Sequence, residues 1–336
     1  MKKLFIALLA LSSMIFAKEV TVSILPQKYF VEKIAKDKID INVMVKPGFS
    51  PATYEPKTSQ MRKLAKSEVY FAIGVPFEKV WLEKFKNANS NMKIVDTAKG
   101  IEKIQMAKHE HHEEEHDHDA HHEEEHDHDA HHEEEHDHDA HHEEEHDHDA
   151  HHEEEHDHDA HREEEHDHDA HHEHAGLDPH IWLDPILVKT QAKNIYKTLI
   201  QIDEKNKNFY KVNYEEFIKE LDELYLQLKT VLKPVKGKAF MVFHPSWGYF
   251  AKRFDLEQIA VEVQGKEPKP NQLVELINEA KEHNIKVVFV APQFSQKSAK
   301  VIASNIKGDA VVMNPLEENL KTSLLNTAKQ IVSSYK

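Results

Sequence analysis

The 336-residue sequence contains no cysteine. It therefore forms no disulfide and offers no thiol for lipid attachment, so apolar side chains alone must hold the fold. Long apolar runs are also scarce. The run at 4–16 is too short and too near the start to favour a membrane span. Lys2 and Lys3 precede it and Ala17 follows it, a pattern that predicts a secretory signal peptide over 1–17 and a soluble periplasmic protein, with an uncleaved anchor as the alternative.

Basic residues are almost missing from the window 109–174. It holds 32 acidic side chains, and its only cation is Arg162, so the window carries about −31 and the remainder about +13. Of 30 histidines, 27 lie in this window, and only His180, His244 and His283 lie outside it. Elsewhere the basic residues are scattered and do not cluster with aromatic residues, which argues against a nucleic-acid partner.

The window consists of six near-copies of HHEEEHDHDA that begin at His111. The H-E-x-x-H pattern of zinc peptidases occurs in five copies, but a peptidase needs both histidines fixed on a helix beside a shaped cleft. A segment whose largest apolar residue is alanine has nothing to bury and is expected to be disordered. Imidazole suits zinc, copper and nickel, and the neighbouring carboxylates attract cations. We therefore expect a metal-collecting insert with several weak sites, and a solvated acidic spacer is the alternative.

Before the insert, apolar runs that suit buried strands alternate with helical patterns, joined by short polar connections. Such alternation predicts a parallel sheet with helices on both faces. Strands are expected at 20–25, 39–45, 69–73 and 93–95, and helices at 27–36, 58–66 and 77–86.

After residue 177 the pattern predicts a helical region to about residue 202 and a long helix over 204–232. Pro234 and Gly237 end that helix. Further strands are expected at 239–243, 257–263, 286–290 and 310–313, with helices at 247–253, 271–283, 295–305 and 316–333. The fold class is therefore α/β, with two lobes joined by a long linker helix. The predicted boundaries are a signal peptide at 1–17, an N-terminal lobe at 18–108, the insert at 109–174, the end of the N-terminal lobe at 175–203, the linker helix at 204–233 and a C-terminal lobe at 234–336.

Two histidines occupy positions from which a lobe presents ligands to a cleft. His180 lies in the stiff turn D-P-H, and His244 lies between an apolar strand and Pro245. Either ring has a packing role as its alternative. His283 ends a charged helix, where a surface cation suits the helix dipole, so we do not expect it to bind metal.

Several motifs resemble one family. They are P-G-x-x-P-x-x-Y-E-P at 47–56, D-P-H-I-W-L-D-P at 178–185, the histidine after the strand that follows the linker, P-Q-F-S at 292–295, and a His- and acid-rich insert before the D-P-H motif. Over its whole mature length the chain resembles the periplasmic metal-binding proteins of ABC importers in the zinc- and manganese-specific group (cluster A-I, ZnuA-like), whose relatives include cell-adhesion proteins.

The resemblance implies two Rossmann-like lobes bridged by a rigid helix, with a metal ion held between them. It also implies a monomer that is not an enzyme and that delivers the ion to an inner-membrane ABC permease with a cytoplasmic ATPase. His180 and His244 match family ligands. Manganese-type relatives have Glu in place of His244, so the resemblance favours zinc as the transported ligand, in agreement with the preference of zinc for nitrogen.

Two positions depart from the family pattern. Ala52 replaces a ligand histidine, and Asn314 replaces an aspartate. Zinc normally takes four ligands, and the part of the chain outside the insert supplies two strong ones. Water, Glu55, Asn314 or a histidine of the insert are the candidates to complete the shell, although Glu55 alternatively holds the turn or supports another ligand. The predicted metal ligands are therefore His180, His244, Glu55 and Asn314.

Three functions remain open at this stage. The leading one is a zinc-binding protein for import. A zinc hydrolase would need a general base beside a bound water, and only Glu55 offers itself. In a storage or buffering protein, the insert would bind most of the metal and the cleft would be vestigial.

Overall fold

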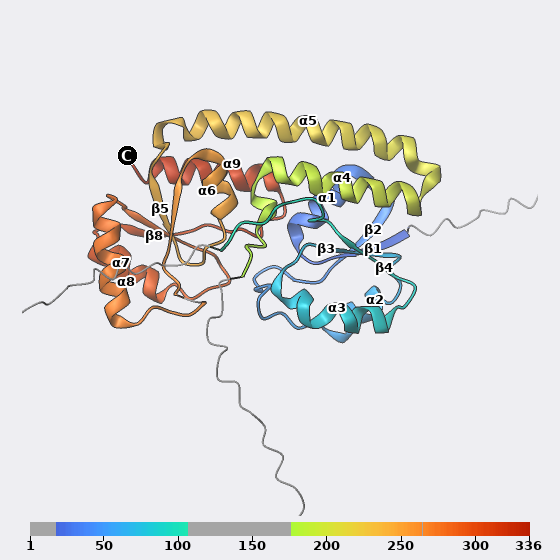
Figure 1. Ribbon diagram of the computed structural model, residues 1–336, viewed down its shortest axis with the longest axis horizontal. Coiled ribbons are helices and arrows are strands. Elements are labelled where there is room, and N and C mark those ends of the chain that lie inside the picture. Colours follow the sequence, from blue (N-terminus) through green and yellow to red (C-terminus); the bar gives the residue numbers. More distant parts are fainter. Residues whose placement is uncertain (1–17, 107–175, 264) are drawn as a thin grey trace, which may run out of the picture. The chain divides into compact units, whose positions relative to one another are not determined.

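The computed structural model describes residues 18–106, 176–263 and 265–336 (Figure 1). The signal peptide predicted at 1–17 and the whole of the insert predicted at 109–174 lie outside these ranges. Within the described ranges, no helix combines the length and the apolar character needed to cross a membrane.

The first lobe is built on a four-stranded parallel sheet in the order β2-β1-β3-β4. The central strand β3 is apolar and wholly buried, and the last three residues of the other central strand, β1, are buried too, as expected for a parallel sheet covered on both faces. Its elements are β1 (Lys18–Val22), α1 (Leu25–Ala35), β2 (Ile39–Val43), α2 (Thr58–Leu64), β3 (Val69–Ala72), α3 (Pro76–Ala88) and β4 (Lys93–Asp96).

The second lobe repeats this arrangement with the strand order β6-β5-β7-β8, again all parallel. The first strand of each lobe is central and lies between the second and third strands. Its elements are β5 (Ala239–Val242), α6 (Gly248–Phe254), β6 (Glu257–Ala260), α7 (Pro270–Glu282), β7 (Val287–Val290), α8 (Lys297–Asn305), β8 (Asp309–Val312) and α9 (Leu320–Ser333).

Two long helices connect the sheets. A 3-10 turn at Ile181–Leu183 leads into α4 (Pro185–Ile202), whose first turn is capped by Asp184, because its side chain accepts a hydrogen bond from the backbone of Ile186. After a second 3-10 turn (Glu204–Asn206), α5 (Lys207–Leu232) packs against α4, against α1 of the first lobe and against α9 of the second (Figure 1). Its buried face recurs at helical spacing and consists of Tyr210, Asn213, Phe217, Leu221, Leu224, Leu228 and Leu232.

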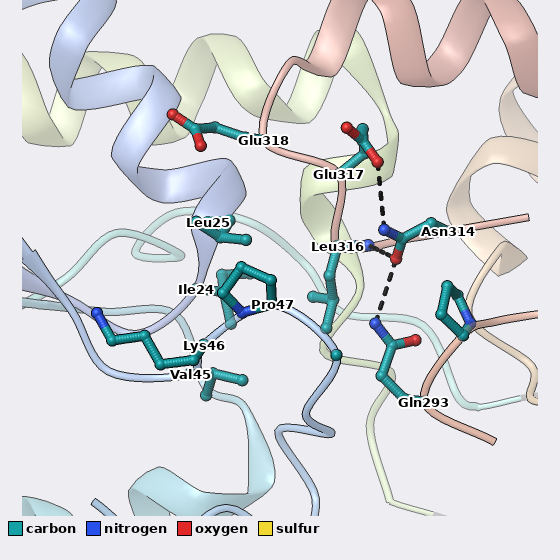
Figure 2. Close-up of a pocket in the computed structure, with 12 residues that line it drawn as sticks. Ile24, Leu25, Val45, Lys46, Pro47, Gln293, Asn314, Leu316, Glu317 and Glu318 are labelled. Carbon is teal, nitrogen blue, oxygen red and sulfur yellow. Dashed lines mark hydrogen bonds between the residues drawn. The ribbon is translucent and has the colours of Figure 1, made fainter. Parts of the chain in front are cut away.

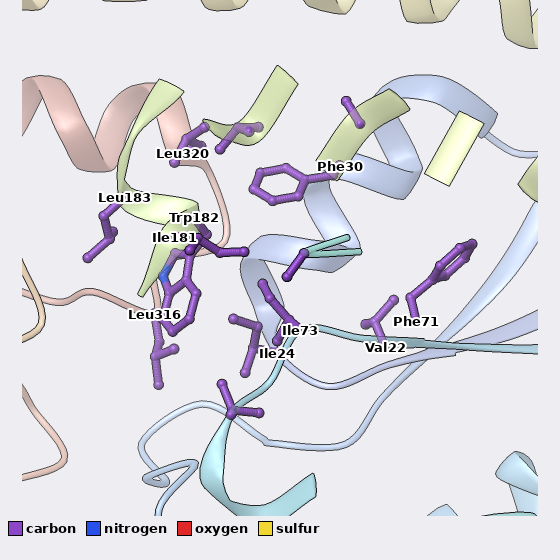
Figure 3. Close-up of a cluster of buried hydrophobic side chains, with 14 of the residues drawn as sticks. Val22, Ile24, Phe30, Phe71, Ile73, Ile181, Trp182, Leu183, Leu316 and Leu320 are labelled. Atoms are coloured by element: carbon purple, nitrogen blue, oxygen red, sulfur yellow. The ribbon is translucent and has the colours of Figure 1, made fainter. Parts of the chain in front are cut away.

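One apolar core runs from the first lobe into the second. Side chains from the first sheet and α1 lie close to Trp182 and its neighbours, and to Leu316 and Leu320 ahead of and within α9 (Figure 3). A second, smaller core lies within the second lobe and includes buried residues of β5, β7, α7 and α8. The shared core and the length of α5 hold the two lobes together.

The predicted fold class is confirmed for the described residues: two α/β lobes with parallel sheets are joined by a long helix. One element differs clearly. The last helix begins at Leu320 and not at 316, because the side chain of Asn319 accepts a hydrogen bond from the backbone N–H of Thr322 and starts the helix there. The residues before it form a loop that the functional site uses.

Candidate metal centre

The rings of His180 and His244 lie edge to face although 64 positions separate them in the sequence. Their ring centres are 5.4 Å apart and their planes are inclined by 73°. Two imidazoles on one tetrahedral zinc ion, with Zn–N bonds of about 2.0–2.1 Å, have ring centres about 5.2 Å apart. The observed spacing therefore suits a shared metal ion.

The His180 ring is oriented by the carboxylate of Asp178. One carboxylate oxygen, Oδ1, lies 2.7 Å from Nδ1 of the ring and also accepts the backbone N–H of His180 at 2.8 Å. The residue is 8% exposed, and burial lowers the pKa of His180 against the opposing effect of Asp178. The neutral ring with its proton on Nδ1 leaves the lone pair of Nε2 for a metal.

His244 has the same kind of support from the second lobe. Its Nδ1 lies 2.9 Å from Oε2 of Glu262, and its ring stacks on Phe294 with centres 4.8 Å apart. The register between β5 and β6 places this carboxylate, because the hydrogen bonding continues beyond the strands and Glu262 donates its backbone N–H to Phe243 at 2.9 Å. Both candidate ligands therefore use Nδ1 for a carboxylate and keep Nε2 for a metal.

The D-P-H-I-W-L-D-P segment is fastened to the second lobe by side-chain bonds. Nε1 of Trp182 donates to the carbonyl of Pro315 at 2.7 Å, and Nε of Arg253 donates to Oδ2 of Asp184 at 2.8 Å. Burial raises the pKa of Asp184, and the Arg253 guanidinium and the backbone N–H of Ile186 oppose this rise. These bonds fix the backbone that carries His180 with respect to α6 and the loop before α9.

The two chain segments that lead into and out of the insert meet beside this site. An antiparallel bridge pairs Gln105 with Leu177, and the backbone N–H of Asp178 donates to the carbonyl of Ile104 at 2.8 Å. The hydroxyl of Tyr249 accepts from the Ile104 backbone at 3.1 Å and donates to the Asp178 carbonyl at 2.9 Å. Burial raises the pKa of Tyr249 to about 12, so this hydroxyl stays protonated.

Asn314 lines a cavity formed by loops of both lobes, which Figure 2 shows. Its amide oxygen accepts from the backbone of Leu316 at 3.1 Å and from Nε2 of Gln293 at 3.3 Å, and its Nδ2 donates to Glu317 at 3.2 Å. The predicted ligand oxygen is thus used to hold the loop between β8 and α9. Binding a metal would require Asn314 to give up these bonds.

Glu55 is exposed, and Ala52 is exposed beside it on the loop between β2 and α2. The neighbouring Tyr54 is buried, and its hydroxyl donates to Oε1 of Gln60 at 2.8 Å. This bond anchors the loop at the position next to Glu55. Within the described residues, no group of three or more His, Cys, Asp or Glu is placed to hold a metal. Of the four predicted ligands, the structure brings together His180 and His244.

His283 caps the C-terminal end of α7, and its Nδ1 lies 3.9 Å from a carboxylate oxygen of Glu257. Its position at the end of a helix is the one expected from the sequence.

Sequence reasoning missed Asp178 and Glu262 as partners of the two histidines. Asp178 stands two residues before His180 in a motif that was recognised, so a turn with an aspartate at that distance was an available signal. Glu262 was harder to find, because its contact depends on the register between two strands.

Two parallel α/β lobes joined by a long helix, with a pair of carboxylate-supported imidazoles between them, define a two-lobed metal-binding protein of the solute-binding class. The family model ZnuA, described as the zinc-uptake complex component A, periplasmic, matches residues 20–334. The chain belongs to this family, and the resemblance seen in its motifs is confirmed.

Known relatives cover most of the chain. The high-affinity zinc uptake system protein ZnuA of Bacillus subtilis (strain 168) is 27% identical over 296 residues, which is 87% of this chain and 76% of that protein. The zinc-binding protein AdcA of Streptococcus pyogenes serotype M3 (strain SSI-1) is 25% identical over 94% of this chain and 56% of its own length.

Solved structures agree in fold. A ZnuA crystal structure is 35% identical with a TM-score of 0.74 and covers 95% of this chain and all of that one. A ZnuA deletion mutant with zinc bound is 34% identical with a TM-score of 0.72, over 95% of this chain and 98% of the other. The laminin-binding adhesin Lmb of Streptococcus agalactiae shares the fold at 20% identity, with a TM-score of 0.66 over 94% of this chain and 99% of its own.

Proposed function

We propose that this protein captures zinc between His180 and His244 in the periplasm and delivers it to the inner-membrane permease of an ABC importer, which a cytoplasmic ATPase drives. The observation that carries the proposal is the ring spacing of 5.4 Å combined with a carboxylate on each Nδ1. Relatives of this chain include zinc uptake proteins and a ZnuA variant with zinc bound, which supports zinc as the ligand.

Nitrogen ligation supports zinc over harder cations. Imidazole prefers zinc, copper and nickel, whereas manganese favours carboxylate and carbonyl oxygen. Availability then decides between zinc and copper, because copper binds nitrogen sites more tightly on intrinsic affinity. The carboxylates of Asp178 and Glu262 increase the basicity of the two rings and fix their orientation.

Two further positions in the zinc shell are left to weaker ligands. We assign water as the default occupant, and Glu55, Asn314 or an insert histidine as candidates that need a rearrangement. Glu55 would have to turn inward from the surface, and Asn314 would have to exchange its bonds to Leu316 and Gln293 for the metal. A site with two strong ligands releases zinc more readily, which suits a protein that hands over its cargo and makes or breaks no covalent bond.

The His-rich insert would collect or buffer zinc for this site. Its two flanking segments pair through Gln105 and Leu177, next to Asp178. The described residues that flank the insert therefore lie close to the segment that carries His180. Collection there raises the local zinc concentration at the site.

Deletion of residues 110–173 separates import from storage. A cleft-based binding protein should keep one tight zinc site after the deletion, counted by titration against a chelator and by metal analysis. A storage protein that acts through the insert should lose nearly all bound zinc, and that result would overturn the proposal. Storage is the second candidate function, because the described residues bring together only two imidazoles.

A further inference from the structure

Two buried polar atoms behind His180 lack a hydrogen-bond partner among the described residues. They are Oδ2 of Asp178, an acceptor, and Nε2 of Gln258, a donor. Asp178 is 1% exposed. A buried polar group without a hydrogen-bond partner destabilises the folded state, more so when it is charged, so each atom requires a partner.

Both atoms lie beside Gly248, at the start of α6, and we refer to the space between them as the gap. A β-carbon built on Gly248 would lie 2.9 Å from Oδ2 of Asp178 and 3.9 Å from Nε2 of Gln258. The nearest apolar atom is Cδ1 of Ile104, at 3.5 Å from that position. Because 2.9 Å is too short a distance between a carbon and a carboxylate oxygen, any side chain at position 248 would crowd Asp178 and narrow the gap.

In both side chains, the second polar atom is held by hydrogen bonds, and these bonds fix the orientation of Gln258 and Asp178. Oε1 of Gln258 accepts the backbone N–H of Trp247 at 2.6 Å, which leaves its NH₂ group as the one that faces the gap. The Oδ1 atom of Asp178 accepts both the backbone N–H and the Nδ1–H of His180. A donor and an acceptor therefore face a common space, and neither can turn away without breaking a bond.

We propose that a single buried water molecule occupies this gap, accepts a hydrogen bond from Nε2 of Gln258 and donates one to Oδ2 of Asp178. Buried waters bind where two to four polar partners surround a space of about one water. The water completes a chain that runs from Trp247 through Gln258 and Asp178 to Nδ1 of His180. Gly248 and Gln258 are positioning residues for that ring, and this consequence rests on the proposed zinc-binding function.

The water itself is tested without zinc. In a crystal structure of the metal-free full chain that resolves ordered solvent, we expect density for a water within hydrogen-bond distance of both Oδ2 of Asp178 and Nε2 of Gln258. A dry gap, or a direct hydrogen bond between the two side chains, overturns the proposal. This outcome is independent of the proposed function, because it does not depend on whether the protein binds zinc.

The positioning role is tested by glycine substitution. Gly248→Ala narrows the gap, whereas Gly176→Ala adds the same methyl group where no described atom lies within 4 Å and is the matched control. With zinc below stoichiometry, so that the tightest site fills first, chelator competition should show about five- to tenfold weaker binding for Gly248→Ala. Wild-type affinity should persist in Gly176→Ala. Equal affinities in both variants overturn the positioning role.

A second variant separates the water from a simple steric clash. Gln258→Leu adds no methyl group beside Gly248 but removes the donor, together with the acceptor of the Trp247 N–H, and it should weaken zinc binding by a similar factor. The double variant Gly248→Ala/Gln258→Leu should bind no more weakly than the weaker single variant, because both changes remove the same water. Multiplicative losses would show that the two positions act independently, against the proposal. Thermal unfolding of each variant establishes that it is folded.

Discussion

The ring centres of His180 and His244 are 5.4 Å apart. Nδ1 of His180 is hydrogen-bonded to Asp178, two positions away in the sequence, and Nδ1 of His244 to Glu262, eighteen positions away. A local turn supplies the first carboxylate, and strand pairing supplies the second. A turn and a strand pairing thus have the same effect: each fixes the orientation of one imidazole and leaves its Nε2 for a metal. The predictions below test this pair, its supports and the loop opposite.

Removing one imidazole should abolish the tight site. In a chain without residues 110–173, we expect His244→Ala to weaken zinc binding by at least about 100-fold, because a second strong ligand of a four-coordinate ion is lost. His283→Ala is the control, since that ring lies at the end of α7 beside Glu257. Isothermal titration with a competing chelator measures both variants. A tight site that survives His244→Ala would locate zinc elsewhere.

The carboxylate behind His244 should matter almost as much as the ring. Glu262→Ala removes the acceptor of the Nδ1–H bond, and losses of about 10- to 100-fold in affinity are typical for such outer partners. Glu257→Ala provides the comparison, because Glu257 faces His283 on the surface. If chelator competition gives the same affinity for both variants, the bond between Glu262 and His244 does not support metal binding.

Restoring a histidine in the loop between β2 and α2 should strengthen the site. Ala52 has no donor atom, so Ala52→His supplies a third imidazole and should tighten zinc binding by about tenfold or more. Thr53→His places the same ring one position further along the same exposed loop and should leave the affinity unchanged. No gain from Ala52→His, or an equal gain from both variants, would count against a missing ligand at position 52.

The fold could be predicted because its signals are local and repeated. Alternating apolar strands and helical stripes predicted the two lobes, and the apolar stripe from Phe209 to Val231 predicted the long helix, although its buried face begins with Tyr210 and ends with Leu232. The histidine pair was also accessible, because His244 follows a strand and His180 follows a proline turn. Both are places where a chain must present its side chains at the edge of a sheet or a cleft.

The surroundings of the histidines depend on contacts between distant segments. Glu262 meets His244 only because β6 pairs with β5 in one register, and no sequence pattern shows that register. Asn314 was a predicted ligand, yet its side-chain oxygen accepts hydrogen bonds from Leu316 and Gln293. Such bonds depend on how loops pack, which neither periodicity nor motif spacing determines.

A buried carboxylate should make the first lobe less stable as the pH rises. Glu78 is 3% exposed, its Oε2 accepts the backbone N–H of Gly74 at 2.8 Å, and its Oε1 accepts that of Ile73 at 3.0 Å. Burial raises the pKa of Glu78 above 4.5, against the opposing effect of its hydrogen bonds with Ser23, Gly74 and Ile73. The folded state therefore binds this proton more tightly than the unfolded state.

The sign of this effect follows from linkage. The stabilisation by protonated Glu78 is complete below the unfolded pKa and is lost as the pH rises from about 4.5 through the raised folded pKa. Glu78→Gln removes this titration. The unfolding free energy of the wild type minus that of Glu78→Gln should therefore fall with rising pH, measured by denaturant titration between pH 4 and pH 7. The exposed Glu83, on the same helix, gives the matched variant Glu83→Gln, in which the substituted carboxyl group is not buried. A difference for Glu78→Gln that is flat or rises with pH would mean that burial does not control this carboxyl group.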